Sequence, residues 1–221
     1  MLVAALLASL PAWSVRTADI SGDMRSVACL CIDEFESLPL PLLPFPGWKE
    51  KAREEAVSKW ITSRQALLSG SQPHALLVAM RNQAEAGRYF EGVDDGLLGF
   101  AEVGLLPAPP EKTEQGHEAP VAPASPELYP YLANLAVKAG ARRLGLGKAL
   151  VVSSEGKATE LGYSRMYIKV DRDNFDARRL YDRNGYKLVY MQNRMPDRTN
   201  KQTQFLFLRK DLAPSPTPRA A

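Results

Sequence analysis

The chain has 221 residues, of which 45% are hydrophobic and 24% are charged, and this length suits one domain with short extra segments rather than two complete domains. Its 28 basic and 25 acidic residues give a formal net charge of only +3, which argues against an extended nucleic-acid interface. The two cysteines, Cys29 and Cys31, and the two histidines, His74 and His117, lack the spacing of a zinc site, so we expect no metal.

Residues 1–12 are nearly all apolar, and no basic residue precedes them. The run is too short for a transmembrane helix, which needs about 20 residues. It fits a secretory or plastid-type leader, the remnant of one, or a degenerate N-terminus. No other stretch is long and apolar enough to span a bilayer, so we expect no stable membrane insertion.

Strand and helix patterns alternate in the region before residue 107. Two segments carry apolar residues at helical spacing, and the proline-rich stretch 38–47 separates them because proline removes a backbone donor and fixes the chain in an extended form. Two later apolar runs, joined by a polar link, suit a hairpin. In chain order we expect a strand at 15–20, helices at 21–38 and 49–68, and antiparallel strands at 74–80 and 96–106.

Two segments are expected to be disordered. Residues 107–126 consist largely of Pro, Ala and Glu, so they cannot bury enough apolar surface to become ordered. Residues 213–221 contain three prolines and read as a disordered tail. The folded domain is therefore predicted to span residues 13–212, with one long loop inside it.

After this loop the pattern becomes regular, and it predicts a mixed sheet with a βαβ crossover in its middle. Gly162 and Gly185 stand where left-handed helix caps are needed. The expected elements are a strand at 131–137, a helix at 145–161, a strand at 164–170, a helix at 174–184, and strands at 186–191 and 204–209.

The run Arg142-Arg-Leu-Gly-Leu-Gly-Lys148 lies where the first of these strands leads into the first of these helices. Gly145 and Gly147 have no side chain to keep a ligand from the backbone, and the N–H groups of a first helical turn attract an anion. The same turn is also compatible with tight packing alone. The third glycine of the dinucleotide fingerprint and the P-loop frame are both missing, which disfavours those nucleotide folds.

Two motifs resemble those of the GNAT superfamily of acetyl-CoA-dependent N-acetyltransferases. The spacing of Arg142, Gly145 and Gly147 is similar to the coenzyme A signature Q/R-x-x-G-x-G/A. A second signature, V-x-x-x-N-x-x-A-x-x-L-Y-x-x-x-G-F/Y, is carried by Val170, Asn174, Ala177, Leu180, Tyr181, Gly185 and Tyr186. The resemblance implies an α/β (α+β) fold with a mixed, mostly antiparallel central sheet flanked by helices and a βαβ core that binds coenzyme A.

The resemblance also implies roles for individual residues. The backbone of Leu135, Ala136 and Val137 would pair with the pantetheine arm as an extra strand does. The residues expected to hold the pyrophosphate are Arg142, Arg143, Leu144, Gly145, Leu146, Gly147 and Lys148. Asn174 would bind the cofactor near its thioester, although it also fits a helix N-cap. Tyr181 would protonate the departing thiolate, although it also fits core packing.

A general base is not evident in the sequence. Glu102 is the only carboxylate embedded in an apolar strand, and it would act through a water molecule if it were the base. We expect instead that Glu102 faces outward and that solvent or a backbone-bound water deprotonates the amine.

The acceptor is expected to be a protein amine, either an α-amino terminus or a lysine, because Asn134-Leu-Ala-Val137 and the Arg-Arg turn resemble the protein N-terminal branch. A small amine is the alternative substrate. A non-catalytic acyl-CoA-binding regulatory domain and a nucleic-acid module built on Arg142, Arg143, Arg178 and Arg179 are the alternatives from other classes. The chain resembles plant or algal plastid members, so we expect a plastid location or, failing that, a cytoplasmic one.

Overall fold

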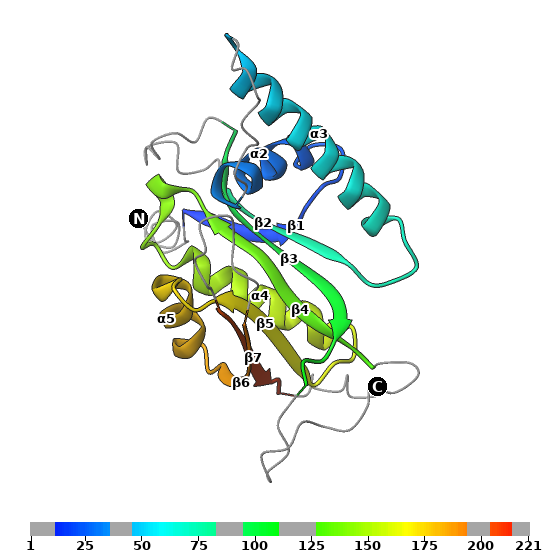
Figure 1. Cartoon of the computed structure of the whole chain (residues 1–221), viewed down its shortest axis with the longest axis vertical. Helices are drawn as coiled ribbons and strands as arrows, with labels where there is room; N and C mark the ends of the chain where they lie inside the picture. Colours follow the sequence, from blue (N-terminus) through cyan, green and yellow to red (C-terminus); the bar gives the residue numbers. More distant parts are fainter. Residues whose placement is uncertain (1–11, 36–45, 83–94, 111–126, 194–203, 214–221) are drawn as a thin grey trace, which may run out of the picture. The chain divides into compact units, whose positions relative to one another are not determined.

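A computed structural model of the chain describes residues 12–35, 46–82, 95–110, 127–193 and 204–213. These residues form seven strands, four α-helices and one 3-10 helix (Figure 1). In chain order the elements are β1 (Trp13–Thr17), α2 (Met24–Phe35), α3 (Trp48–Leu68), β2 (Ala75–Arg81), β3 (Leu97–Pro107), β4 (Leu128–Val137), η2 (Ala139–Ala141), α4 (Leu146–Glu160), β5 (Arg165–Asp171), α5 (Phe175–Arg183), β6 (Lys187–Asn193) and β7 (Gln204–Asp211).

The strands form one sheet in the order β1-β2-β3-β4-β5-β7-β6. β1 and β2 are antiparallel, as are β5 with β7 and β6 with β7, whereas β4 and β5 are parallel. The predicted mixed sheet and its βαβ crossover, β4-α4-β5, are therefore confirmed. All predicted helices and strands are present, and their ends differ from the predicted ones by up to three residues.

Contacts divide the chain into two compact units, which are described separately. The first comprises residues 1–69, 76–101 and 134–150. Its helices α2 and α3 lie side by side (Figure 1). Apolar side chains at helical spacing on α2 and α3 meet those of the strands, which explains why these two segments fold as amphipathic helices. The buried cluster consists of Met24, Val27, Ala28, Leu30, Cys31, Ile32, Val57, Trp60, Leu76, Val78, Leu97, Phe100 and Ala136.

The second unit comprises residues 70–75, 102–133 and 151–221. Here β7 pairs with β5 on one edge and with β6 on the other, with a register shift between Leu188 and Tyr190. Gly162 and Gly185 both have positive φ, 87° and 88°, as predicted for the residues that end α4 and α5. The second cap directs the chain so that the ring of Tyr186 lies 6.1 Å from that of Tyr181.

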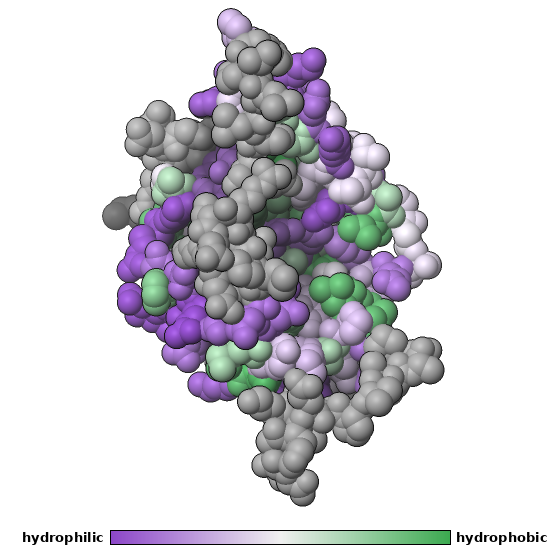
Figure 2. Space-filling view, in the orientation of Figure 1, coloured by the Kyte–Doolittle hydropathy of each residue, from purple (hydrophilic) through white to green (hydrophobic). Residues whose placement is uncertain are grey.

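The face shown in Figure 2 is mainly polar, with hydrophobic groups in separate patches. Such scattered apolar exposure is ordinary for a folded domain. No helix of the described residues is long and apolar enough to cross a membrane.

Most of the segments predicted to be disordered or cleaved lie outside the described residues. These are residues 1–11 of the expected leader, 111–126 of the loop and 214–221 of the tail. Pro107, which we placed in the loop, is the last residue of β3, and its carbonyl accepts a hydrogen bond from the Tyr131 hydroxyl (2.9 Å). The leader and the plastid location stay predictions.

Candidate functional site

The end of β4 is irregular where the resemblance places the pantetheine arm. Parallel pairing with β5 joins Tyr131 to Tyr167 and Leu132 to Ile168. Asn134 follows with a positive φ of 47°, a left-handed conformation that is uncommon outside glycine and that asparagine adopts more often than most residues. Such a residue departs from regular strand geometry, and it stands directly before Leu135, Ala136 and Val137.

Gly99 of β3 fits closely against this part of β4. A Cβ atom at Gly99 would lie 2.6 Å from the carbonyl oxygen of Ala136 and 3.2 Å from the Cα of Val137. Just beyond, the Lys138 N–H donates to the carbonyl of Leu98 (2.9 Å). The absence of a side chain at Gly99 thus allows β3 to hold the end of β4 from one side, a role that we did not predict from the sequence.

The turn before α4 has the geometry of an anion site. Arg143 and Gly145 both have positive φ, 68° and 84°, and a Cβ atom at Gly145 would meet nothing within 4 Å. The helical hydrogen bonds begin with the Ala149 N–H, which donates to the Gly145 carbonyl (3.0 Å). The N–H groups of Leu146, Gly147 and Lys148 precede this bond, so they have no acceptor within the helix.

The side chains of the turn divide into two groups. Arg143, Leu144 and Lys148 are exposed, so the two cations stand at the surface beside the turn. Leu146 is buried in the core, so only its backbone could contact a ligand. The turn therefore combines N–H groups that have no acceptor within the helix, a helix dipole and two positive charges, which together suit a pyrophosphate.

The guanidinium of Arg142 is engaged with protein groups. Its Nη2 contacts both carboxylate oxygens of Glu34 on α2 (2.8 and 2.9 Å), and its Nε donates to the carbonyl of Val137 (3.0 Å). We assigned Arg142 to the cofactor, whereas these contacts join α2, the end of β4 and the turn. A half-exposed ion pair adds little to stability, about 0–1 kcal/mol, but it orients these three parts.

Asn174 and Tyr181 belong to the second unit. Asn174 is the N-cap of α5, and its Oδ1 accepts from the N–H of Ala177 (3.1 Å), so the capping role is confirmed. Tyr181 lies two turns later, is only 7% exposed, and packs edge to face with Tyr186. Burial raises the pKa of Tyr181 to about 12, because the phenolate would lose its hydration.

The expectation that Glu102 faces outward is wrong. Its side chain is 4% exposed, and its Oε1 lies 2.8 Å from Nε2 of His74, the residue directly before β2. A Cβ atom at Gly104 would lie 3.2 Å from Nδ1 of the same imidazole. A carboxylate in an apolar strand is tolerated when it is paired, and the sequence alone does not reveal a partner 28 positions away.

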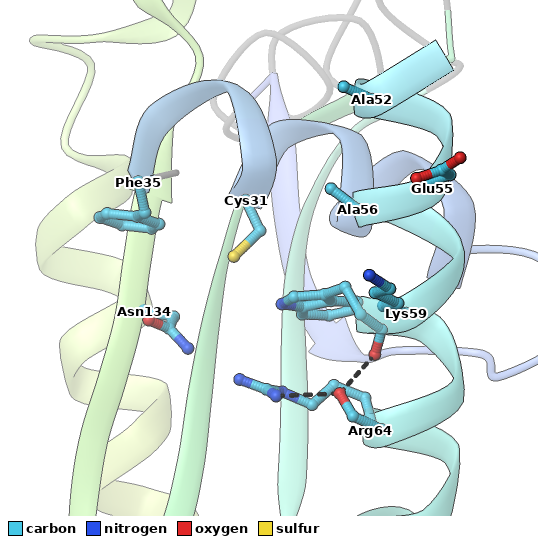
Figure 3. A pocket seen from close by; sticks show the side chains of 10 residues that line it. Cys31, Phe35, Ala52, Glu55, Ala56, Lys59, Arg64 and Asn134 are labelled. Atoms are coloured by element: carbon cyan, nitrogen blue, oxygen red, sulfur yellow. Dashed lines mark hydrogen bonds between the residues drawn. The ribbon is translucent and has the colours of Figure 1, made fainter. Parts of the chain in front are cut away.

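A pocket of about 490 Å³ opens between α2, α3 and Asn134 of β4 (Figure 3). Figure 3 shows Arg64 reaching from α3 toward Asn134, with Cys31 and Phe35 of α2 above them. The lining residues are Cys31, Phe35, Ala52, Glu55, Ala56, Lys59, Trp60, Ser63, Arg64 and Asn134. All of them belong to the first unit, as do the Leu135–Val137 strand and the Arg142–Lys148 turn.

Comparisons with known proteins agree with this geometry. Residues 48–186 match the acetyltransferase (GNAT) family. Among solved structures, the chain resembles yncA, a putative acetyltransferase from Salmonella typhimurium with its cofactor acetyl-CoA (15% identity, TM-score 0.56, 95% of this chain and 99% of that one). It also resembles a ribosomal-protein-alanine N-acetyltransferase from Brucella melitensis (16% identity, TM-score 0.55, 90% of this chain and 99% of that one). A third similar structure is NAA60 of Arabidopsis thaliana in complex with a bisubstrate analogue (16% identity, TM-score 0.57, 92% of this chain and 99% of that one). No curated protein matches the sequence.

The fold and the glycine turn thus define an enzyme that uses acetyl-CoA to acetylate an amine. The chain belongs to the acetyltransferase (GNAT) family. Its own residues fit the cofactor, because the turn offers N–H groups without an acceptor in the helix and open space at Gly145. The predicted superfamily, fold class, enzyme class and cofactor are all confirmed.

We expect Gly99→Ala to destabilise the fold and to weaken acetyl-CoA binding together. The added methyl group overlaps the Ala136 carbonyl, so the end of β4 must shift, at a cost of about 1–3 kcal/mol. Urea unfolding and titration calorimetry measure the two effects. The matched control is Gly156→Ala in α4, where the Cβ meets nothing within 4 Å and helix stability should rise by about 0.5–1 kcal/mol. Native stability and affinity in Gly99→Ala would contradict the close fit.

Proposed function

We propose that this enzyme acetylates a protein or peptide amine, either an α-amino terminus or a lysine, and that the pocket between α2 and α3 receives the acceptor. The proposal is supported by the resemblance of Asn134-Leu-Ala-Val137 and the Arg-Arg turn to the protein N-terminal branch. Two of the similar structures carry names in keeping with it, the ribosomal-protein-alanine N-acetyltransferase and NAA60.

The charge of the pocket disfavours a polyamine as the acceptor. Its lining contains one carboxylate, Glu55, against two cations, Lys59 and Arg64. A polyamine has several positive charges, which require several carboxylates for compensation when they leave water. A peptide amine brings at most one charge to the site and many carbonyl oxygens, so it suits this lining better.

Acetyl-CoA supplies an acetyl thioester, which the amine nitrogen attacks at the carbonyl carbon as the bond to sulfur breaks. The backbone of Leu135–Val137 would bind the pantetheine amides and polarise the thioester carbonyl. The N–H groups of Leu146, Gly147 and Lys148 would bind the pyrophosphate, with Arg143 and Lys148 adding charge. Arg142 would hold the turn in place through Glu34.

Tyr181 would return a proton to the leaving sulfur. Its phenol remains protonated at neutral pH, since its pKa is raised to about 12. Asn174 already caps α5 through Oδ1, which leaves its amide N–H₂ as the group that would donate to the cofactor. Glu102 is committed to His74, so we propose that solvent or a backbone-bound water accepts the proton of the amine.

The experiment that tests this function is acetyl-CoA turnover against a mixed panel of peptides, polyamines and free amino acids, with each product located by mass spectrometry. We expect acetylated peptides and little acetylated polyamine. Acetylation of small amines alone would show that the acceptor is a small amine and not a protein or peptide. Binding of acetyl-CoA without any turnover would identify a regulatory acyl-CoA-binding domain.

A further inference from the structure

One residue that lines the pocket between α2 and α3 carries a buried hydrogen-bond donor without a partner among the described residues. Trp60 of α3 lines this pocket and is 5% exposed. Its indole Nε1 is buried and has no hydrogen-bond partner among the described residues. Most buried N–H groups in folded proteins are paired, because leaving one unpaired costs the full loss of its hydration. An unpaired donor in a pocket wall therefore points to a ligand atom that accepts.

The surroundings hold this indole in one orientation. The ring of Phe100 meets it edge to face at 6.4 Å, and the guanidinium carbon of Arg64 lies 5.1 Å from the indole centroid. Arg64 donates from Nη1 to the hydroxyl of Ser63 (3.2 Å), which donates to the carbonyl of Trp60 (2.8 Å), as the dashed lines of Figure 3 show. A donor held this way is preorganised for a ligand.

We propose that Trp60 Nε1 donates to a carbonyl oxygen adjacent to the acceptor amine, so that the enzyme acetylates the α-amine of a polypeptide and not a lysine side chain. This inference rests on the proposed function and selects between its two amines. At a polypeptide N-terminus the first peptide carbonyl is bonded to the α-carbon that carries the amine, so its oxygen is two bonds from that carbon. The amine and the oxygen therefore enter the same pocket.

The position of the pocket agrees with this assignment. Asn134 contributes to its wall and directly precedes the backbone of Leu135–Val137, which would carry the thioester end of the cofactor. The positive guanidinium of Arg64 beside the indole further favours an electronegative oxygen over a second ammonium group. The apolar wall, made by Phe35, Ala52 and Ala56, suits the first side chain of the peptide.

A lysine acceptor does not use this donor. Its ammonium group stands at the end of a four-carbon stem, so no carbonyl oxygen accompanies the amine into the pocket. Lysine also needs a strong base at neutral pH, because its pKa is about 10.4, whereas an α-amine has a pKa of about 7.7–8.0 and is partly neutral without help. The pairing of Glu102 with His74 removes the one buried strand carboxylate that we considered for that base.

The test compares two acceptors that differ only in their first peptide group, and with it in the carbonyl oxygen. The first is an alanine-initiated peptide, and the second is the same peptide with a trans-alkene in place of its first peptide bond. We expect the ratio of their kcat/KM values to fall by about three- to tenfold in Trp60→Phe, the effect of one lost hydrogen bond. The control Trp48→Phe, at the start of α3 and outside the lining, should keep the wild-type ratio. An unchanged ratio in a folded Trp60→Phe enzyme overturns the inference.

A second measurement uses the unaltered protein, in case Trp60→Phe does not fold. The chain has three tryptophans, so the indole ¹H–¹⁵N signal of Trp60 is assigned by elimination from the spectra of Trp13→Phe and Trp48→Phe. We expect a downfield shift of this signal with the peptide and none with the alkene analogue. Identical spectra with both ligands at saturation overturn the inference.

A third peptide, blocked at its α-amine and carrying one lysine, separates this inference from the proposed function. Acetylation of that lysine, with the free α-amine of the first peptide untouched, leaves the proposed function intact and overturns the α-amine assignment. Acetylation of neither peptide overturns the proposed function, and the indole shift then still decides whether the pocket binds a carbonyl oxygen.

Discussion

Gly147→Val should abolish acetyl-CoA binding while the fold stays largely intact. The branched side chain would stand at the first turn of α4, where the backbone N–H groups would meet the pyrophosphate. Loss of two hydrogen bonds to a charged group, at about 1.5–3 kcal/mol each, lowers affinity by about a hundredfold or more. Titration calorimetry measures the affinity, and circular dichroism measures the fold.

The matched control for this change is Gly156→Val, in the same helix. A Cβ at Gly156 meets nothing within 4 Å, so the substitution tests the effect of valine on α4 without touching the turn. We expect its acetyl-CoA affinity to equal that of the unaltered protein. Native affinity in Gly147→Val would remove the pyrophosphate assignment, whatever the control shows.

Tyr181→Phe should lower the rate of acetyl transfer by about ten- to a thousandfold with little change in acetyl-CoA affinity. The substitution keeps the ring that packs against Tyr186 and deletes only the hydroxyl. The lost proton donor acts mainly in the transition state, and general acids contribute about 10²–10⁴-fold. Single-turnover rates are the measurement, because slow product release would hide the effect in steady-state kcat.

The pH dependence follows from the direction of the Tyr181 pKa shift. A raised pKa, to about 12, keeps the phenol in its protonated, donating form throughout pH 6–9. The ratio of wild-type to Tyr181→Phe rates should therefore stay constant over that range. Tyr186→Phe, which deletes a neighbouring buried hydroxyl, should retain the wild-type rate. Equal rates for Tyr181→Phe and wild type from pH 6 to 9 would show that Tyr181 only packs.

The local pattern of the sequence was sufficient to predict the elements and the glycine turn at the start of α4. Helical spacing, strand runs and capping glycines depend on neighbours in the chain, which is why the order of elements and Gly162 and Gly185 were predicted correctly. The position of Gly145 and Gly147 at the start of a helix could be predicted for the same reason, since a helix N-terminus is a local structure. The superfamily followed from the spacing of two motifs.

Only the tertiary structure decided which side chains meet across long separations. Glu102 proved to be buried because its partner is His74, and Arg142 proved to be tied to Glu34, which is 108 positions away. The sequence could not predict that the indole N–H of Trp60 lacks a partner, because a tryptophan at helical spacing has the same pattern as any other core residue. Hydrogen bonding and burial are set by the three-dimensional packing of distant segments, so no local pattern records them.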